Sequence, residues 1–146
     1  MSFDTKAIKQ LNEEEFQFGN MSFIAGDVMD WINGQKDLSK SIFFSMRTCV
    51  LLPQDFIDLL YKKLAEKHCS IIVGFEPYGL SRSTNSIYEQ TEGYKESVLY
   101  RDTMYLHNYL GILNSYGYEM DRLQYIKTAH IDSDYRIQSF TAVKEK

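Results

Sequence analysis

The stretch Ser41-Ile-Phe-Phe-Ser-Met-Arg-Thr-Cys-Val50 begins with a short apolar run and continues into polar residues. Residues Pro53 to Glu66 follow, with apolar side chains at helical spacing, and then Cys69-Ser-Ile-Ile-Val-Gly-Phe-Glu-Pro77 forms a second apolar run. An apolar run, an amphipathic helix and another apolar run are typical of a βαβ crossover. We therefore predict two parallel strands of one sheet, joined by a helix.

The predicted crossover helix begins at Pro53, because proline suits the first turn of a helix. We expect one side of this helix to be buried, and that side carries Phe56, Leu59, Leu60 and Leu64.

Both predicted strands end in residues that can carry chemistry. Ser45 to Arg47 follow the first apolar run, and Glu76 to Tyr78 follow the second. In open parallel sheets a ligand binds beyond the carboxyl ends of the strands. The sequence therefore predicts a binding site formed by these two segments.

The N-terminal third has weaker patterns. Residues Asp4 to Glu15 have helical apolar spacing, and Met21 to Ala25 read as a short buried strand. Val28, Trp31 and Ile32 then mark the apolar side of a short helix that ends at Gly34, and residues 35–40 are polar and predict a surface loop.

The C-terminal half predicts one helix and a hairpin. Residues 79–101 lack periodicity and follow a strand end, so we expect a lid loop there. Asp102 to Tyr116 have helical spacing and are followed by Gly117. Tyr118 to Thr128 and Tyr135 to Val143 read as strands separated by turn residues, which predicts an antiparallel hairpin.

These elements define the expected fold class. It is an α/β fold with a partial Rossmann-like sheet, whose parallel strands are followed by a C-terminal antiparallel hairpin. The chain has 146 residues, enough for one hydrophobic core, and we predict a single domain over residues 1–146.

The composition of the chain argues against several classes of function. The formal charge of −4 and the lack of a dense Lys/Arg cluster argue against a nucleic-acid partner. No apolar run is long enough to span a membrane and no signal peptide is visible, so we expect no membrane association and a cytoplasmic protein. Cys49 and Cys69 have no companion ligands at zinc spacing, which predicts reduced thiols and no metal site.

Several nucleotide and hydrolase motifs are missing from the sequence. It contains neither GxGxxG nor GxxxxGK[ST], so it has no recognisable cradle for a dinucleotide or a triphosphate. It also contains no GxSxG or HExxH motif.

Three side chains are candidates for polar chemistry, each with a structural alternative. Arg47 could clamp a carboxylate or phosphate, or be a solvated loop residue. Glu76 could transfer protons if burial raises its pKa, or be a hydrogen-bonded carboxylate at a strand end. His107 could be a general base, or an ordinary helix histidine.

Asp27 follows Gly26 directly before the short helix. Its carboxylate could accept hydrogen bonds from a ligand, or it could cap the helix that begins at Val28. The sequence alone leaves both roles open.

Taken together, the sequence resembles the C-terminal part of a class I S-adenosylmethionine-dependent methyltransferase, similar to sugar or small-molecule O-methyltransferases. The family's first two strands and its glycine-rich turn have no counterpart in this chain. The segments that carry the resemblance are Phe23 to Val28, Phe43 to Arg47, Leu52 to Leu64, Ile71 to Tyr78 and His107 to Glu119.

The resemblance implies residue roles. S-adenosylmethionine would be the cofactor, with Asp27 on the adenine amino group and the strand end beside the transferred methyl. The implied roles are cofactor binding by Gly26, Asp27, Val28, Ser45 and Met46, substrate binding by Arg47, Tyr78 and Asn108, and proton transfer by Glu76 or His107.

The resemblance also leaves two functional hypotheses. The first is methyl transfer to a small molecule, possibly a sugar, by this chain or by a longer enzyme of which it is the C-terminal portion. The second is a non-catalytic methyltransferase-like module used for self-association or partner binding. Because the sheet would lack its middle strands, we expect a homo-oligomer or a missing N-terminal half.

Overall fold

The computed structural model describes residues 6, 22, 24–81, 86–87, 97–100, 102–126 and 135–145. The chain divides into two compact units, Met1–Gln35 and Lys36–Lys146, and each is considered by itself. The expectation of a single domain over residues 1–146 stays a prediction.

The second unit contains the predicted βαβ crossover. Strand β1 (Ile42–Met46) is followed by helix α3 (Gln54–Glu66) and strand β2 (Ile71–Ser81). The two strands are parallel, with Ile42 opposite Ile71 and Met46 opposite Phe75. The prediction from the opening sequence stretch is therefore confirmed.

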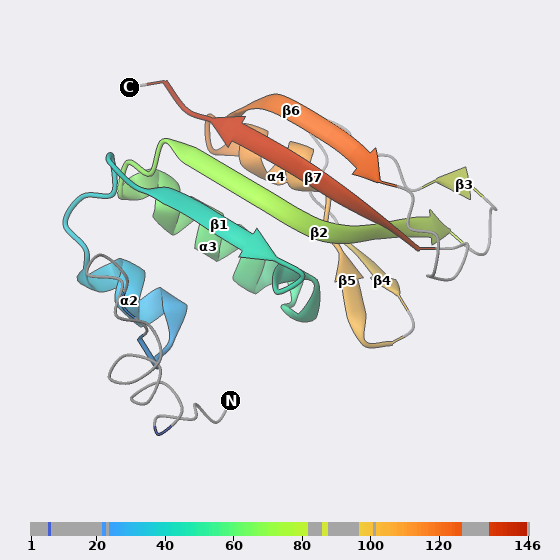
Figure 1. Ribbon diagram of the computed structural model, residues 1–146, viewed down its shortest axis with the longest axis horizontal. Helices are drawn as coiled ribbons and strands as arrows, with labels where there is room; N and C mark the ends of the chain where they lie inside the picture. The colour runs from blue at the N-terminus through green and yellow to red at the C-terminus, as the bar shows by residue number, and fades with distance from the viewer. Residues whose placement is uncertain are drawn as a thin grey trace. The chain divides into compact units, whose positions relative to one another are not determined.

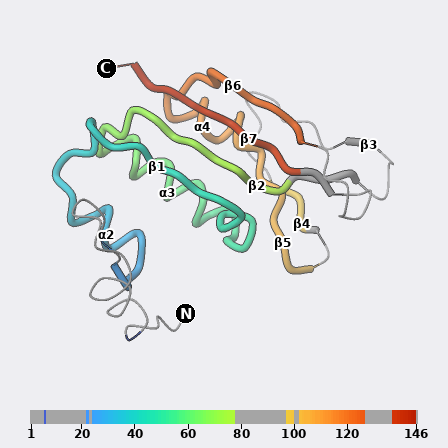
Figure 2. The backbone as a smooth tube through the Cα atoms, viewed as in Figure 1, coloured from blue at the N-terminus to red at the C-terminus, as the bar shows by residue number. Residues whose placement is uncertain are grey.

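The sheet is mixed, and the order of its main strands is β1-β2-β7-β6 (Figure 1). Strands β6 (Glu119–Ile126) and β7 (Tyr135–Val143) are antiparallel to each other, as predicted. Strand β7 lies between β2 and β6 and is antiparallel to both, which the trace in Figure 2 also shows. The α/β class with parallel strands and a C-terminal antiparallel hairpin is confirmed.

One face of the sheet is covered by helix α3. This face carries Phe43 of β1, Ile72 and Gly74 of β2, and Phe140 of β7, which lie in register with one another or at alternate positions. Phe43 contacts Tyr61 of α3 edge to face, so α3 packs on this face.

Helix α4 (Tyr109–Ser115) packs on the same face as α3. The Tyr109 ring stacks on Phe140 with centroids 4.8 Å apart, and it meets the Tyr61 ring edge to face at 6.2 Å. The main core of this unit therefore lies between one sheet face and two helices.

The buried side of α3 is shifted by one residue from the prediction. Its buried residues include Ile57, Leu60, Tyr61 and Leu64, whereas Leu59 is 43% exposed. The observed set also has the i, i+3, i+4, i+7 spacing of a helix face. Periodicity allowed two adjacent faces, and contact of Tyr61 with Phe43 shows which one packs on the sheet.

The predicted helix over Asp102 to Tyr116 is wrong in its first half. Residues Met104–Leu106 form strand β5, which pairs antiparallel with β4 (Val98–Tyr100). Asn108 caps α4 by accepting a hydrogen bond from the backbone N–H of Gly111, so the helix begins only at Tyr109. Gly117, with a φ of 84°, follows the helix as predicted.

The expected lid loop over 79–101 is wrong where the structure describes it. Strand β2 continues to Ser81, and β3 (Ser86–Ile87) pairs with its end. Strand β7 pairs with β2 as far as Gly79, so the backbone of this segment has a partner. Residues 82–85, 88–96 and 101 lie outside the described residues.

The first unit contains helix α2 (Val28–Gly34), as predicted. The expected buried strand over Met21 to Ala25 is wrong for the residues described, because Ile24 is not in a strand and is 66% exposed. Of the predicted helix over Asp4 to Glu15, only Lys6 is described, and it is helical.

The predicted surface loop over residues 35–40 is confirmed except at Leu38, whose side chain is buried. No helix in the described part of the chain has both the length and the apolar character needed to cross a membrane.

Gly74 allows the Phe140 ring to lie against the backbone of β2. A Cβ atom on Gly74 would overlap atoms of this ring, which also stacks on Tyr109. The side chain of any other residue would push the ring from its place between the sheet and α4.

We therefore expect Gly74→Ala to lower the free energy of unfolding by about 1–3 kcal/mol, because overpacking a core displaces its side chains. Urea denaturation measures this loss. Gly34→Ala is the matched control, since a Cβ there has nothing within 4 Å. An equal effect of both substitutions would contradict the packing explanation.

Candidate functional site

The carboxyl end of β1 lies beside the middle of β2, because β2 continues to Ser81. The sequence predicts that Glu76 to Tyr78 follow the second strand, but they lie within β2 and pair with β7. Met46 is opposite Phe75, and the backbone N–H of Arg47 donates to the carbonyl oxygen of Phe75 at 2.9 Å. The chain then turns into η2 (Cys49–Leu51), a short 3-10 helix. The structure thus brings the segment Ser45 to Arg47 next to Glu76.

Glu76 is fully buried in β2, one residue after the partner of Met46. Its Oε1 accepts hydrogen bonds from the backbone N–H of Cys49 at 3.3 Å and of Thr48 at 3.4 Å. Its Oε2 has no hydrogen-bond partner among the described residues. Burial raises the pKa of Glu76, although the hydroxyl of Ser45 and these N–H groups oppose the shift.

Cys49, Tyr61 and Tyr109 near Glu76 are also buried, and the pKa of each is raised. Burial, and next the nearby Glu76 carboxyl, raise the pKa of the Cys49 thiol to about 12. The Cys49 sulfur lies 3.9 Å from the hydroxyl of Tyr61, and burial keeps the pKa of both Tyr61 and Tyr109 well above the usual value. Cys49 is therefore a poor nucleophile in this environment.

His107 lies between β5 and α4 and is fully buried. Its Nε2 is 2.9 Å from the carbonyl oxygen of Cys49 and 3.0 Å from that of Leu52, so Nε2 carries the hydrogen. Its Nδ1 then accepts from the Ser97 hydroxyl at 2.6 Å. Burial lowers the pKa of His107, and the two carbonyls oppose this shift.

Both ring nitrogens of His107 therefore have hydrogen-bond partners. These contacts join the end of the β4–β5 hairpin to the turn after β1, which supports a structural role. The role of His107 as a general base stays a prediction.

The other predicted site residues of this unit lie in different environments. Ser45 is buried on the helix-covered face, whereas Met46 is 57% exposed and points to the opposite face. Arg47 is exposed, and Asn108 is buried as the cap of α4. The side chain of Tyr78 lies outside the described part. The structure therefore does not place these side chains on one common surface.

The first unit has a hollow of its own, with a volume of about 280 Å³. Asp27 lies at its wall and caps α2, since its Oδ1 accepts from the backbone N–H of Met29 at 2.7 Å and of Asp30 at 3.2 Å. The capping role that the sequence left open is thus present. The hollow is lined by Ser22, Ile24, Gly26, Asp27, Val28 and Trp31.

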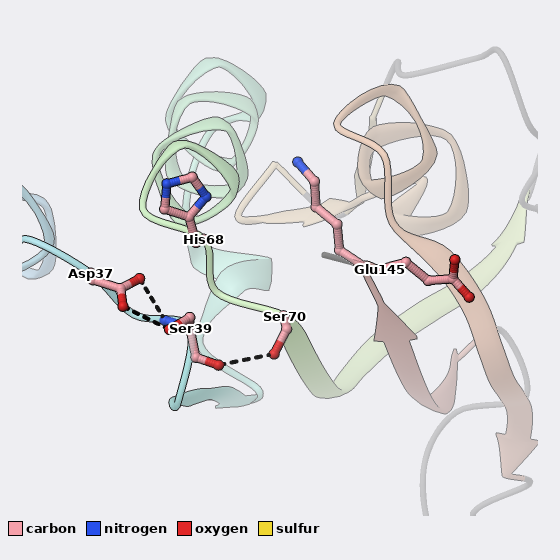
Figure 3. A pocket seen from close by; sticks show the side chains of 6 residues that line it. Asp37, Ser39, His68, Ser70 and Glu145 are labelled. Atoms are coloured by element: carbon pink, nitrogen blue, oxygen red, sulfur yellow. Dashed lines mark hydrogen bonds between the residues drawn. The ribbon is translucent and has the colours of Figure 1, made fainter.

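A larger hollow of about 520 Å³ lies at the amino ends of β1 and β2, away from the predicted site (Figure 3). Asp37 accepts from the hydroxyl of Ser39 at 2.7 Å, and Ser70 donates to the Ser39 carbonyl at 3.4 Å. Exposed His68 and Glu145 complete the wall with Lys144, whose Nζ donates to the carbonyl of Tyr116. Of the lining residues, Asp37, Ser39 and Ser70 therefore bind one another.

Sequence reasoning missed several residues of these sites. The sequence places Trp31 only on the apolar side of α2, whereas in the structure Trp31 is 43% exposed and lines the hollow of the first unit. Ser97, the hydroxyl partner of His107, fell inside the expected lid. Tyr61 could have been found, because it is four residues after Ile57 and continues one helix face.

The fold is that of methyltransferases that bind S-adenosylmethionine. The chain is similar to magnesium protoporphyrin IX methyltransferase (ChlM) from Synechocystis PCC 6803 with bound SAM, with a TM-score of 0.55 and 13% sequence identity. The aligned part is 94% of this chain and 52% of that one.

The structure of the same enzyme with bound SAH gives a TM-score of 0.57 at 14% identity, over 94% of this chain and 57% of that one. The chain thus spans about half the length of these structures. No family model matches the chain, and no curated protein matches its sequence.

The raised pKa of Glu76 predicts a pH-dependent stability. A carboxyl group that holds its proton more tightly in the folded state stabilises the fold below its ordinary pKa, and this contribution is lost as the pH rises through the raised pKa. We expect the free energy of unfolding to fall as the pH rises from about 4.5, and Glu76→Gln to remove this part of the slope.

Urea denaturation at a series of pH values tests this expectation. Glu66→Gln is the control, because Glu66 is exposed and its hydrogen bond to Lys63 lowers its pKa. The same pH slope in the wild type and in Glu76→Gln would contradict a buried proton on Glu76.

Proposed function

We propose that this chain acts in S-adenosylmethionine-dependent methyl transfer to a small-molecule acceptor. The observation that carries the proposal is the hollow of the first unit, whose lining includes Gly26, Asp27 and Val28. The methyltransferase resemblance assigns cofactor binding to all three residues and contact with adenine to Asp27 and Val28. The fold shared with two structures of a methyltransferase supports the same reaction.

The hollow fits an adenine ring by size and chemistry. A volume of about 280 Å³ is at the lower end for small-molecule sites, so it suits one ring system rather than a whole cofactor. Ile24 and Trp31 offer exposed apolar surface for a planar ring. The Asp27 carboxylate offers an acceptor for an amino group while its Oδ1 caps α2.

Residues at the carboxyl end of β1 are our candidates for acceptor binding. S-adenosylmethionine supplies an activated methyl group, and methyl transfer depends mainly on how the acceptor is placed. Met46 and Arg47 are exposed at the carboxyl end of β1, where a bound acceptor would meet them. The Arg47 guanidinium would bind an acidic group of the acceptor. A sugar acceptor and a cytoplasmic location belong to the proposal on sequence grounds alone.

Titration with S-adenosylmethionine tests the function. Trp31 is the only tryptophan of the chain, so its fluorescence should change when adenine occupies the hollow. Cofactor at about 100 times its Kd should add about 2.7 kcal/mol to the free energy of unfolding. Absence of heat, fluorescence change and stabilisation at millimolar cofactor would contradict the proposal.

Asp27→Asn separates ligand binding from helix capping. Asparagine caps helices as well as aspartate does, so stability should not change. Because a hydrogen bond to a charged group is lost, we expect cofactor affinity to fall by about 10- to 100-fold in calorimetry. Asp30→Asn, outside the lining of the hollow, should leave affinity unchanged.

We also propose that the chain forms homo-oligomers through β1. This strand is at one end of the sheet order β1-β2-β7-β6, and its face opposite the helices carries Ile42, Phe44 and Met46, which are 61%, 58% and 57% exposed. Three large apolar side chains at alternate positions form a patch that association would bury.

Phe44→Asp tests this surface. A charge at the centre of the patch should shift the protein toward monomer in analytical ultracentrifugation, because a buried carboxylate is costly. Leu59→Asp, on the outer side of α3 and 43% exposed, is the control. A wild type that is monomeric at all concentrations would exclude the association.

A further inference from the structure

The backbone of Arg47 has an unusual conformation. Its φ of 52° lies in the left-handed region, which residues other than glycine rarely adopt. Such a conformation is unfavourable for a residue with a Cβ atom, so other contacts must hold it. Among the described residues other than glycine, only His68 and Asp102 share a positive φ.

His68 and Asp102 owe this conformation to local structure. His68 follows the end of α3, where Cys69 donates to the carbonyl oxygen of Leu64, and left-handed residues are common at helix ends. Asp102 lies in the tight turn between β4 and β5. Arg47, by contrast, follows a parallel strand.

The turn after Arg47 is held by a residue distant in sequence. Thr48 is the N-cap of η2, but its side chain makes no capping hydrogen bond, and its hydroxyl donates instead to the carbonyl of Met46 at 3.0 Å. The N–H groups of Thr48 and Cys49 are instead taken by Oε1 of Glu76. Glu76 therefore supplies the cap that the local sequence lacks.

We infer that Glu76 is a positioning residue, which holds Arg47 in the left-handed conformation and so sets the shape of the strand end. Because the carboxyl is fully buried, it has no surface on which to touch an acceptor directly. It acts through the turn that presents the Arg47 guanidinium. The functional value of this turn rests on the proposed function, in which Arg47 meets the acceptor.

A thermodynamic cycle between positions 47 and 76 tests the inference. Glycine relieves strain at position 47 only while Glu76 enforces the conformation. Arg47→Gly should therefore favour folding more in the presence of Glu76 than in Glu76→Ala, by about tenfold in the unfolding equilibrium constant. His68→Gly is the matched control and should have the same effect in both backgrounds. Equal effects of Arg47→Gly in both backgrounds would overturn the inference.

A second measurement tests the inference if the Glu76→Ala variant is too unstable to fold. Glu76→Asp shortens the side chain by one carbon and so moves the carboxylate away from the turn. This variant can replace Glu76→Ala in the cycle. The backbone chemical shifts of Arg47 should leave the left-handed range in Glu76→Asp or Glu76→Ala, and stay there in Glu76→Gln, which keeps an acceptor oxygen. Unchanged shifts in all three variants would also overturn the inference.

The cycle needs no ligand, so its result is independent of the proposed function. Failure to bind S-adenosylmethionine would remove the proposed function and leave the coupling measurable. Zero coupling would remove the positioning role and leave cofactor binding in the first unit untouched.

Discussion

A row of aromatic rings joins the sheet of the second unit to both of its helices. Phe43 of β1 meets Tyr61 of α3, Tyr61 meets Tyr109 of α4, and Tyr109 stacks on Phe140 of β7. The row closes only because Gly74 leaves space for the Phe140 ring. The remaining contacts of the helix-covered face depend on this arrangement, since closely packed interiors tolerate little displacement.

The same packing buries the polar side chains next to the end of β1 and so shifts their pKa values. Glu76 lies on the sheet face that carries this row, and burial raises the pKa of both Glu76 and Tyr109. The His107 ring meets the Tyr109 ring edge to face and is held by two carbonyls and a hydroxyl. At the end of β1, Met46, Arg47 and Thr48 are therefore exposed, whereas Ser45 and Glu76 are buried beneath them.

The errors of sequence reasoning share a cause. The segment Asp102 to Leu106 has helical spacing, but pairing of β5 with β4 gives its backbone partners that no local pattern reveals. Strand β2 extends past Pro77 because β7 pairs alongside it. Met21 to Ala25 are apolar enough for a strand, yet apolar character alone does not provide a neighbouring strand. The partner of β5 is the neighbouring strand β4 and the partner of β2 is the distant strand β7, and apolar spacing along the chain reveals neither pairing.

The sequence by itself determined the βαβ crossover, the terminal hairpin and the helix stop at Gly117, because each follows from local periodicity or backbone preference. It also placed Ser45 to Arg47 next to Glu76, since the two strands of the crossover run in the same direction, but it left the role of Asp27 open. Only the tertiary structure decided that β7 lies between β2 and β6, and that Glu76 and His107 are buried. Burial and strand order depend on contacts between residues far apart in the chain, which spacing along the sequence does not encode.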